Sequence, residues 1–161
     1  MGFTIRTIGA PTPDFEALVD THTTFCDGTA PAESCHRLPV SALFGPGLTV
    51  WTVTAADGAL VGMGALKALP GGDGEVKSMH TRQSVRGQGV ARAMLETILA
   101  EGARRGYGAL WLETGAHPDF VPARRLYAAH GFVETGPFGS YRPDPHSVFM
   151  TRRLDVMEPA A

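Results

Sequence analysis

The segment Arg86-Gly87-Gln88-Gly89-Val90-Ala91 leads into the strongest helical pattern in the chain. Apolar residues then recur on one broad face, which predicts an amphipathic helix. They are Val90, Ala91, Met94, Leu95, Ile98 and Leu99. The first turn of a helix leaves backbone N–H groups unpaired and carries partial positive charge. Because Gly87 and Gly89 lack side chains and Arg86 and Arg92 add charge, the segment predicts a phosphate-binding turn. The alternative is that the glycines only shape a tight turn.

A strand is predicted on each side of this helix. The strand Glu75–His80 precedes the helix, after a glycine-rich turn, and the strand Ala109–Thr114 follows it. The second strand contains few polar residues, which is typical of a strand buried within a parallel sheet. Strand, helix and strand therefore predict a right-handed parallel unit, in which Gly106 ends the helix.

The other segments predict a mixed sheet with helices around it. Asp57-Gly58 is typical of a hairpin turn, and the apolar runs beside it predict two antiparallel strands. Outside the parallel unit, the predicted elements are a strand Phe3–Ile8, a helix Asp14–Gly28, a short helix Glu33–Leu38, strands Leu48–Val53 and Leu60–Leu66, a helix Pro122–Gly131 and a strand Ser147–Arg152. This order predicts the α/β class, with a mixed sheet.

The composition is that of one ordinary domain. The chain has 161 residues, which predicts a single domain over residues 1–156 and a frayed tail over 157–161. A net charge of −2 and 19% charged residues predict no nucleic-acid or membrane partner. No apolar run reaches the roughly 20 residues of a membrane helix, and the N-terminus lacks a signal-peptide pattern, so we expect a cytoplasmic protein. Cys26 and Cys35 match no metal or disulfide spacing, which favours reduced thiols.

Other nucleotide-binding motifs can be compared with the glycine-containing turn. A P-loop requires Lys followed by Ser or Thr after its second glycine, whereas Val90-Ala91 follows Gly89. A dinucleotide fingerprint requires a third small residue, and Arg92 occupies that position. Glu113 lies at a suitable distance along the chain to contact a ribose. A dinucleotide-binding oxidoreductase therefore remains an alternative.

Two sequence blocks resemble the GNAT superfamily of N-acetyltransferases. Arg86-x-x-Gly89-x-Ala91 resembles the family signature Arg/Gln-x-x-Gly-x-Gly/Ala, and the block from Ala123 to Phe132 resembles a second motif, Ala-x-x-Leu-Tyr-x-x-x-Gly-Phe. The order of elements is similar to that of the family across nearly the whole chain. The resemblance implies a mixed sheet with splayed fourth and fifth strands and about four flanking helices. It also implies direct acetyl transfer from acetyl-CoA to a primary amine of a small molecule or peptide, without a metal. Dimers are common in the superfamily, so a homodimer is expected as one option.

The resemblance also places the co-substrate. The pantetheine arm is expected to pair like an added strand with Met79, His80 and Thr81. The diphosphate is expected on the signature turn, at Arg86, Gly87, Gln88, Gly89, Val90, Ala91 and Arg92. The chain has Phe120 where many members have an Asn that contacts the arm. Thr114 or a backbone group is expected to replace that contact.

Acetyl transfer requires an unprotonated amine, a polarised carbonyl and a proton for the departing thiolate. Tyr127 matches the family tyrosine that protonates the CoA sulfur, and Glu75 lies where the family often has a carboxylate that removes the amine proton. A backbone N–H near Met79 is expected to polarise the carbonyl. The alternatives are a packing role for Tyr127 and a solvated or salt-bridged side chain for Glu75.

The acceptor amine is expected near Ser34, His36 and Tyr141; the alternatives are a packing role for His36 and a rigid surface turn after Tyr141. In the family the helix region that contains Ser34 and His36 walls the acceptor pocket, and Tyr141 precedes a loop with two prolines. The histidines show no metal-ligand spacing, so no metal site is predicted. The competing class is a non-catalytic acyl-CoA-binding module, and the presence of both Glu75 and Tyr127 favours an enzyme.

Overall fold

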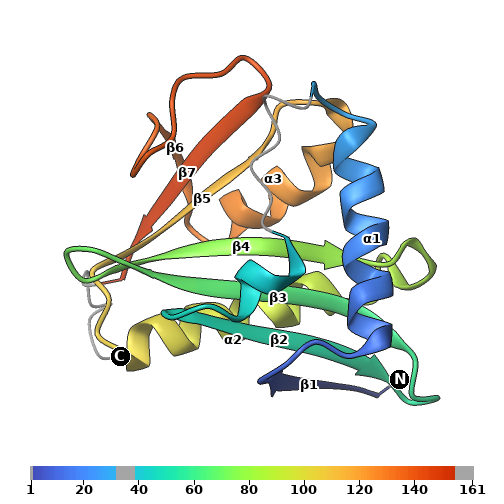
Figure 1. Ribbon diagram of the computed structural model, residues 1–161. Helices are drawn as coiled ribbons and strands as arrows, with labels where there is room; N and C mark the ends of the chain where they lie inside the picture. The colour runs from blue at the N-terminus through green and yellow to red at the C-terminus, as the bar shows by residue number, and fades with distance from the viewer. Residues whose placement is uncertain (1, 32–38, 155–161) are drawn as a thin grey trace.

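The computed structural model describes residues 2–31 and 39–154, which form a seven-stranded sheet in the order β1-β2-β3-β4-β5-β7-β6 (Figure 1). The strands are β1 (Phe3–Ile8), β2 (Leu48–Ala55), β3 (Leu60–Leu69), β4 (Asp73–Thr81), β5 (Ala109–Gly115), β6 (Val133–Thr135) and β7 (Ser147–Arg153). Neighbouring strands are antiparallel except for β4 and β5, which are parallel. The mixed sheet predicted from the order of elements is therefore confirmed.

The parallel strands β4 and β5 are joined for only a short distance. Their register contains the pairs Gly74↔Leu110, Glu75↔Trp111 and Val76↔Leu112. Beyond Val76 the two strands diverge, and Figure 1 shows β5 running obliquely away from β4. The sheet consequently opens at the carboxyl end of β4, as the family resemblance implied.

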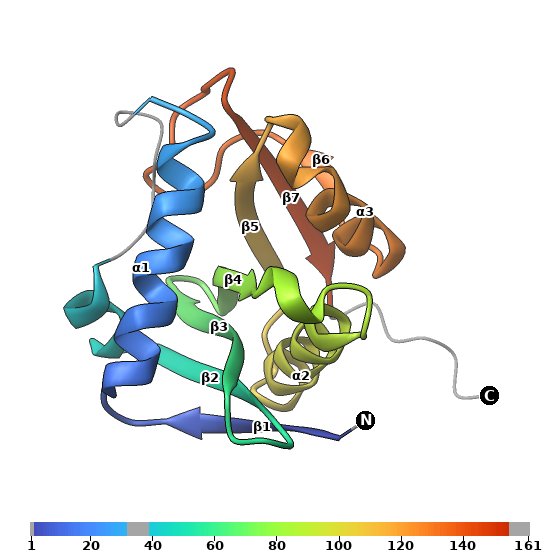
Figure 2. The same ribbon diagram turned by 90° about the vertical axis from the view of Figure 1, so that its right-hand side faces the viewer.

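Helices cover both faces of the sheet. The α-helices of the described residues are α1 (Pro13–Asp27), α2 (Val90–Arg104) and α3 (Val121–Ala129). Figure 2 shows α1 on one side of the sheet and α2 and α3 on the other. Shorter 3₁₀ segments span Val40–Phe44, Gln83–Val85 and Pro118–Phe120. No helix within residues 2–31 and 39–154 is long and apolar enough to span a membrane.

Each face of the sheet has its own hydrophobic core. The α2 and α3 face gathers Met94, Ile98 and Tyr127 against strand residues such as Trp51. The α1 face gathers Phe15, Leu18 and Val19 around other sheet residues, including Val50, Met63 and Ala65. Neighbouring residues of β2, Val50 and Trp51, thus belong to opposite cores because side chains alternate along a strand.

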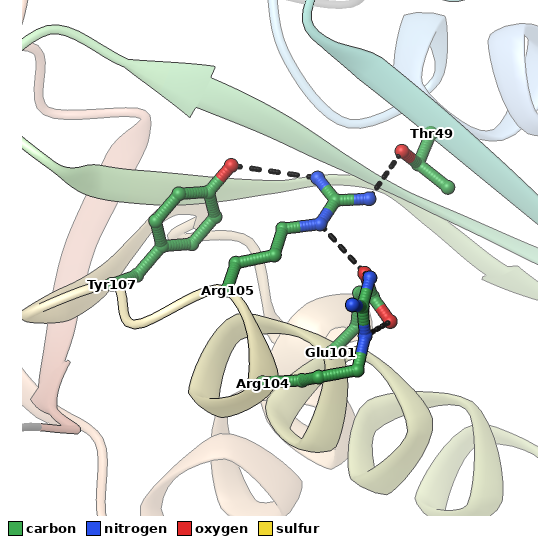
Figure 3. Close-up of polar contacts among 5 residues, drawn as sticks. All are labelled: Thr49, Glu101, Arg104, Arg105 and Tyr107. Atoms are coloured by element: carbon green, nitrogen blue, oxygen red, sulfur yellow. Dashed lines mark hydrogen bonds and ion pairs between the residues drawn. The ribbon is translucent and has the colours of Figure 1, made fainter.

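The far end of α2 is fastened to the sheet by polar contacts (Figure 3). The Arg105 guanidinium donates to Glu101 Oε2 at 2.6 Å and to Thr49 Oγ1 of β2 at 2.7 Å. Hydrogen bonds from Arg104 and then Arg105 lower the pKa of the Glu101 carboxyl to about 2. Arg105 also lies 3.4 Å from the Tyr107 hydroxyl. The Thr49 hydrogen bond therefore ties the carboxyl end of α2 to β2, and the salt bridge with Glu101, which lies within the helix, holds the Arg105 guanidinium in place.

Most predicted elements are confirmed within one or two residues, but some are not. The strand β6 was not predicted, and neither were the 3₁₀ segments. The predicted helix Glu33–Leu38 and the whole predicted tail, residues 157–161, lie outside the described residues.

The contact between α2 and β3 depends on the absence of a side chain at Gly64. A Cβ built there would lie 2.8 Å from Met94 Cγ and 3.1 Å from Ile98 Cδ1. We expect Gly64→Val to lower the free energy of unfolding by about 1–3 kcal/mol, because the helix would have to shift. Urea denaturation measures the change. Gly136→Val is the matched control, since a Cβ at the exposed Gly136 meets nothing within 4 Å. Equal stability of the two variants would contradict the close packing.

Candidate active site

Two adjoining hollows lie where β4 and β5 separate. The first, called the groove, runs over the carboxyl end of β4, the turn into α2 and one side of α3. The second, called the inner pocket, lies between β4 and β5 and is bordered by α1 and the segment before β7. Both are lined by His22, Met79, Phe120, Ala123 and Tyr127. These shared residues mark the place where a ligand in one hollow would meet a ligand in the other.

The turn into α2 has the backbone conformation that its glycines predict. Gly87 and Gly89 have φ values of 82° and 83°, in the left-handed region that favours glycine. Gly89 is the residue that caps α2, and its carbonyl accepts from Ala93 N at 3.0 Å. A Cβ at either glycine would meet no atom within 4 Å, so the space above the turn is open. An open surface beside the first turn of a helix suits an anion such as a diphosphate.

At the edge of the groove, a β-bulge changes the orientation of the β4 backbone. Met63 pairs with His80 and Ala65 with Lys77, so Ser78 and Met79 together face one residue of β3. Ser78 has a φ of 57°, which is uncommon for a residue other than glycine. Such a bulge interrupts the regular ladder and turns backbone groups away from the neighbouring strand. The irregularity occurs at Met79, near which the sequence predicted a polarising N–H.

Tyr127 lies at the junction of the two hollows. The side chain comes from α3, is only 5% exposed and packs edge-on against Phe132 with ring centroids 5.8 Å apart. Burial, and to a smaller extent the charge of Glu113, raises the pKa of the Tyr127 hydroxyl above its ordinary value. The phenol therefore keeps its proton at ordinary pH and can serve as a proton donor.

Glu75 is neither solvated nor at the surface. The residue is 4% exposed, and its Oε2 accepts from Tyr141 Oη at 2.6 Å and from Lys77 Nζ at 3.0 Å. Lys77 Nζ also donates to Tyr141 Oη at 3.1 Å, which closes a triangle of polar contacts. Burial, together with the neighbouring Glu75 carboxylate, raises the pKa of Tyr141. Tyr141 is thus brought to the inner pocket with Glu75, although 66 residues separate them.

Glu113 is a functional candidate that the sequence analysis did not assign to catalysis. It lies on β5, lines the inner pocket and has a pKa raised to about 7. Burial is the main cause, and the charges of Glu75 and Asp144 act in the same direction, while Ser147 and Lys77 oppose the shift. The signal in the sequence is a single carboxylate within a largely apolar strand, and spacing along the chain alone interprets it only as a ribose ligand.

The other predicted site residues are distributed between the two hollows. The groove is lined by Met79, His80, Thr81, Arg86, Gly87, Gly89, Val90, Ala91 and Arg92. Gln88 belongs to the same turn, where its N–H donates to Val85 O at 3.3 Å. Thr114 lines the inner pocket, and Ser34 and His36 lie outside the described residues. Phe120 lines both hollows and packs against Phe25 of α1, with ring centroids 5.2 Å apart. In the described part of the chain, no three His, Cys, Asp or Glu side chains are grouped to hold a metal ion.

Comparison with known families agrees with this geometry. Residues 15–132 match the model of the acetyltransferase (GNAT) family. The chain belongs to the GNAT family. It is therefore an acyltransferase, and the dinucleotide-binding oxidoreductase is no longer needed as an alternative.

Curated GNAT relatives cover most of the chain. The chain is 44% identical over 138 residues to the uncharacterized N-acetyltransferase YsnE of Bacillus subtilis, covering 86% of this chain and 91% of that protein. It is 42% identical over 125 residues to the IAA acetyltransferase of Azospirillum brasilense, covering 77% and 80%. A crystal structure from Klebsiella pneumoniae, assigned as an acyl-CoA N-acyltransferase, has 29% identity and a TM-score of 0.78, covering 94% of this chain and 97% of that one.

The raised pKa of Glu113 predicts a pH-dependent stability. Because the carboxyl titrates near pH 7 when folded and near 4.5 when unfolded, folding favours its protonated form. The resulting stabilisation is complete below pH 4.5 and is lost as the pH rises through 7. Glu113→Gln stays neutral, so its free energy of unfolding should rise relative to that of the original protein by about 3 kcal/mol between pH 4.5 and 8. Urea denaturation across this range measures the difference, and parallel pH profiles would contradict the prediction.

Proposed function

We propose that this GNAT enzyme transfers the acetyl group of acetyl-CoA directly to the primary amine of a small molecule, within a ternary complex. The observation that carries the proposal is the position of Tyr127, which lines both the groove and the inner pocket. A proton donor at this junction can reach a thiolate that leaves from the groove side while the amine enters from the pocket side. Two hollows that meet at one acid are what a direct transfer requires.

The groove is proposed to bind acetyl-CoA, which supplies the activated acetyl group as a thioester. Backbone N–H groups of the first turn of α2 and the charge of Arg86 and Arg92 would hold the diphosphate. The pantetheine arm would run along Met79, His80 and Thr81, where β4 has parted from β5. Backbone pairing with an extended ligand follows the same hydrogen-bonding pattern as strand addition.

Tyr127 is proposed as the general acid. Its raised pKa keeps the hydroxyl protonated at ordinary pH, so that it can donate a proton to the sulfur as the carbon–sulfur bond of the thioester breaks. The backbone at the Ser78-Met79 bulge is proposed to polarise the acetyl carbonyl by donating a hydrogen bond.

For the general base, the geometry favours Glu113 over the predicted Glu75. Glu75 already accepts hydrogen bonds from Lys77 and Tyr141, so its negative charge is compensated. Glu113, with a pKa of about 7, can accept a proton from an ammonium group near neutral pH. We propose that Glu113 takes the amine proton and that Glu75 positions Lys77 and Tyr141 along the pocket wall. The sequence hypothesis, in which Glu75 is the base, is distinguished by the kinetics below.

The proposal is tested first by ligand binding and then by turnover. Calorimetry with CoA, acetyl-CoA and NAD should detect binding of the first two only. Release of the CoA thiol is then followed with a panel of primary amines, peptides and carboxylic acids that lack an amine, including indole-acetic acid because a relative carries that name. Binding of acetyl-CoA without transfer to any primary amine would refute the proposed acceptor class.

Substitution of Gly89 tests the diphosphate site. Gly89→Val should weaken acetyl-CoA binding by at least about tenfold, because its side chain enters the open space above the turn. Gly106→Val is the matched control. Gly106 lies just beyond the other end of α2, has a φ of 75° and also has no atom within 4 Å of a built Cβ. Thermal melts should show a similar loss of stability in both variants, and calorimetry should show lost affinity only for Gly89→Val. Equal affinities would refute the assigned site.

Substitutions of the acid and the base test the mechanism. Tyr127→Phe should leave acetyl-CoA affinity nearly unchanged and lower kcat by on the order of 10²-fold, because one hydroxyl is lost. Glu113→Gln should lower kcat/KM similarly and remove the decline of activity below pH 7, whereas Glu75→Gln should retain that decline. Steady-state kinetics from pH 5.5 to 9 measure both effects. If the decline of activity below pH 7 is lost in Glu75→Gln and kept in Glu113→Gln, Glu75 is the base. A wild-type kcat for Tyr127→Phe would make Tyr127 a packing residue.

A further inference from the structure

A thiol and two imidazoles form a chain of contacts beside the inner pocket. Cys26 and His22 lie one turn apart on α1, with Cys26 Sγ 3.7 Å from His22 Nε2. The other ring nitrogen of His22, Nδ1, lies 3.0 Å from Nδ1 of His80 on β4, and the two rings meet edge to face. This arrangement joins a nucleophile to a base, and the base to a third group that orients it.

The protonation state of His80 determines which groups of this chain of contacts donate a hydrogen bond and which accept one. Burial, with smaller contributions from His22, Arg86 and Arg82, lowers the pKa of His80 to about 3, so its imidazole is neutral at ordinary pH. A neutral imidazole has one nitrogen that accepts a hydrogen bond. When His80 Nδ1 is that acceptor, His22 donates through Nδ1, and its Nε2 faces Cys26 Sγ as a proton acceptor. His22 can then hold the thiol proton while His80 stabilises the resulting imidazolium.

The chain of contacts lies at the place where acyl transfer is proposed. Cys26 lines the inner pocket, His80 lines the groove and His22 lines both. Tyr127, the proposed acid, borders the same junction. A thiolate at Cys26 would therefore face the acetyl thioester from the acceptor side.

We propose that Cys26 is a site of self-acetylation by acetyl-CoA, an inference that rests on the acetyl-CoA binding proposed above. His22 removes the proton from Cys26 Sγ, and the thiolate attacks the acetyl carbonyl. A carbon–sulfur bond forms at Cys26 as the carbon–sulfur bond to CoA breaks, and the CoA thiolate takes the proton that His22 had removed from Cys26. Because one thioester replaces another, the exchange is reversible and its extent follows the ratio of acetyl-CoA to CoA. The acetyl group on Cys26 would then occupy part of the inner pocket and compete with the amine.

Mass spectrometry of the full chain tests this inference. The protein is incubated with acetyl-CoA and no amine, and peptides are mapped under mildly acidic conditions. We expect one acetyl group on the Cys26 peptide, its removal by added CoA, and a rate on the order of 10²-fold lower in His22→Gln. Cys35→Ser is the matched control and should still be acetylated, whereas Cys26→Ser should not be.

Calorimetry on the same samples separates this inference from the proposed function. If acetyl-CoA binds and Cys26 stays unmodified, self-acetylation is refuted and the proposed function stands. The same holds if each of the two cysteines, Cys26 and Cys35, is acetylated no faster in the folded protein than in the urea-unfolded chain. Absence of acetyl-CoA binding would refute both.

Discussion

The early separation of β4 from β5 is the constraint on which the site depends. Their pairing ends at Val76↔Leu112, and β5 continues as the partner of β7. Among the residues that the structure describes, no strand pairs with the backbone of β4 beyond Val76 on the side that faces β5, although backbone N–H and C=O groups need hydrogen bonds. An extended ligand with amide groups can supply them. The bulge at Ser78-Met79 and the glycine turn follow along the same line, so the thioester end and the diphosphate end of one ligand would each meet a suitable surface.

Glu75 and Glu113 both line the inner pocket, but their surroundings differ because Lys77 donates a hydrogen bond to Glu75. Lys77 donates to Glu75, and Tyr141 donates to the same oxygen, so the buried charge of Glu75 is balanced by hydrogen bonds. Glu113 receives only a weaker electrostatic effect from Lys77, and burial dominates its titration. Enzymes commonly separate acid and base roles by giving similar groups different environments. In this pocket, the difference follows from which carboxylate the lysine can reach.

Local sequence patterns could predict the elements, while contacts between distant residues decided the chemistry. The apolar stripe from Val90 to Leu99 predicted α2, and glycines at 87 and 89 predicted a turn whose positive φ values the structure contains. The strand β6 is three residues long, too short for a periodic signal. The environment of Glu113 depends on Lys77 from β4 and Ser147 from β7, which no spacing along the sequence brings together. For the same reason no sequence pattern predicts the contact of Tyr141 with Glu75.

The separate cores on the two faces of the sheet divide the site between two packing units. Tyr127 is part of the core that holds α2 and α3, whereas α1, which carries His22 and Cys26, is anchored by Phe15 and Leu18 in the other core. Elements packed in different cores can open with different free energies. A local opening of α1 would therefore widen the inner pocket while the turn that faces the groove keeps its shape. Exchange of the proposed acceptor and retention of the proposed co-substrate can thus be uncoupled.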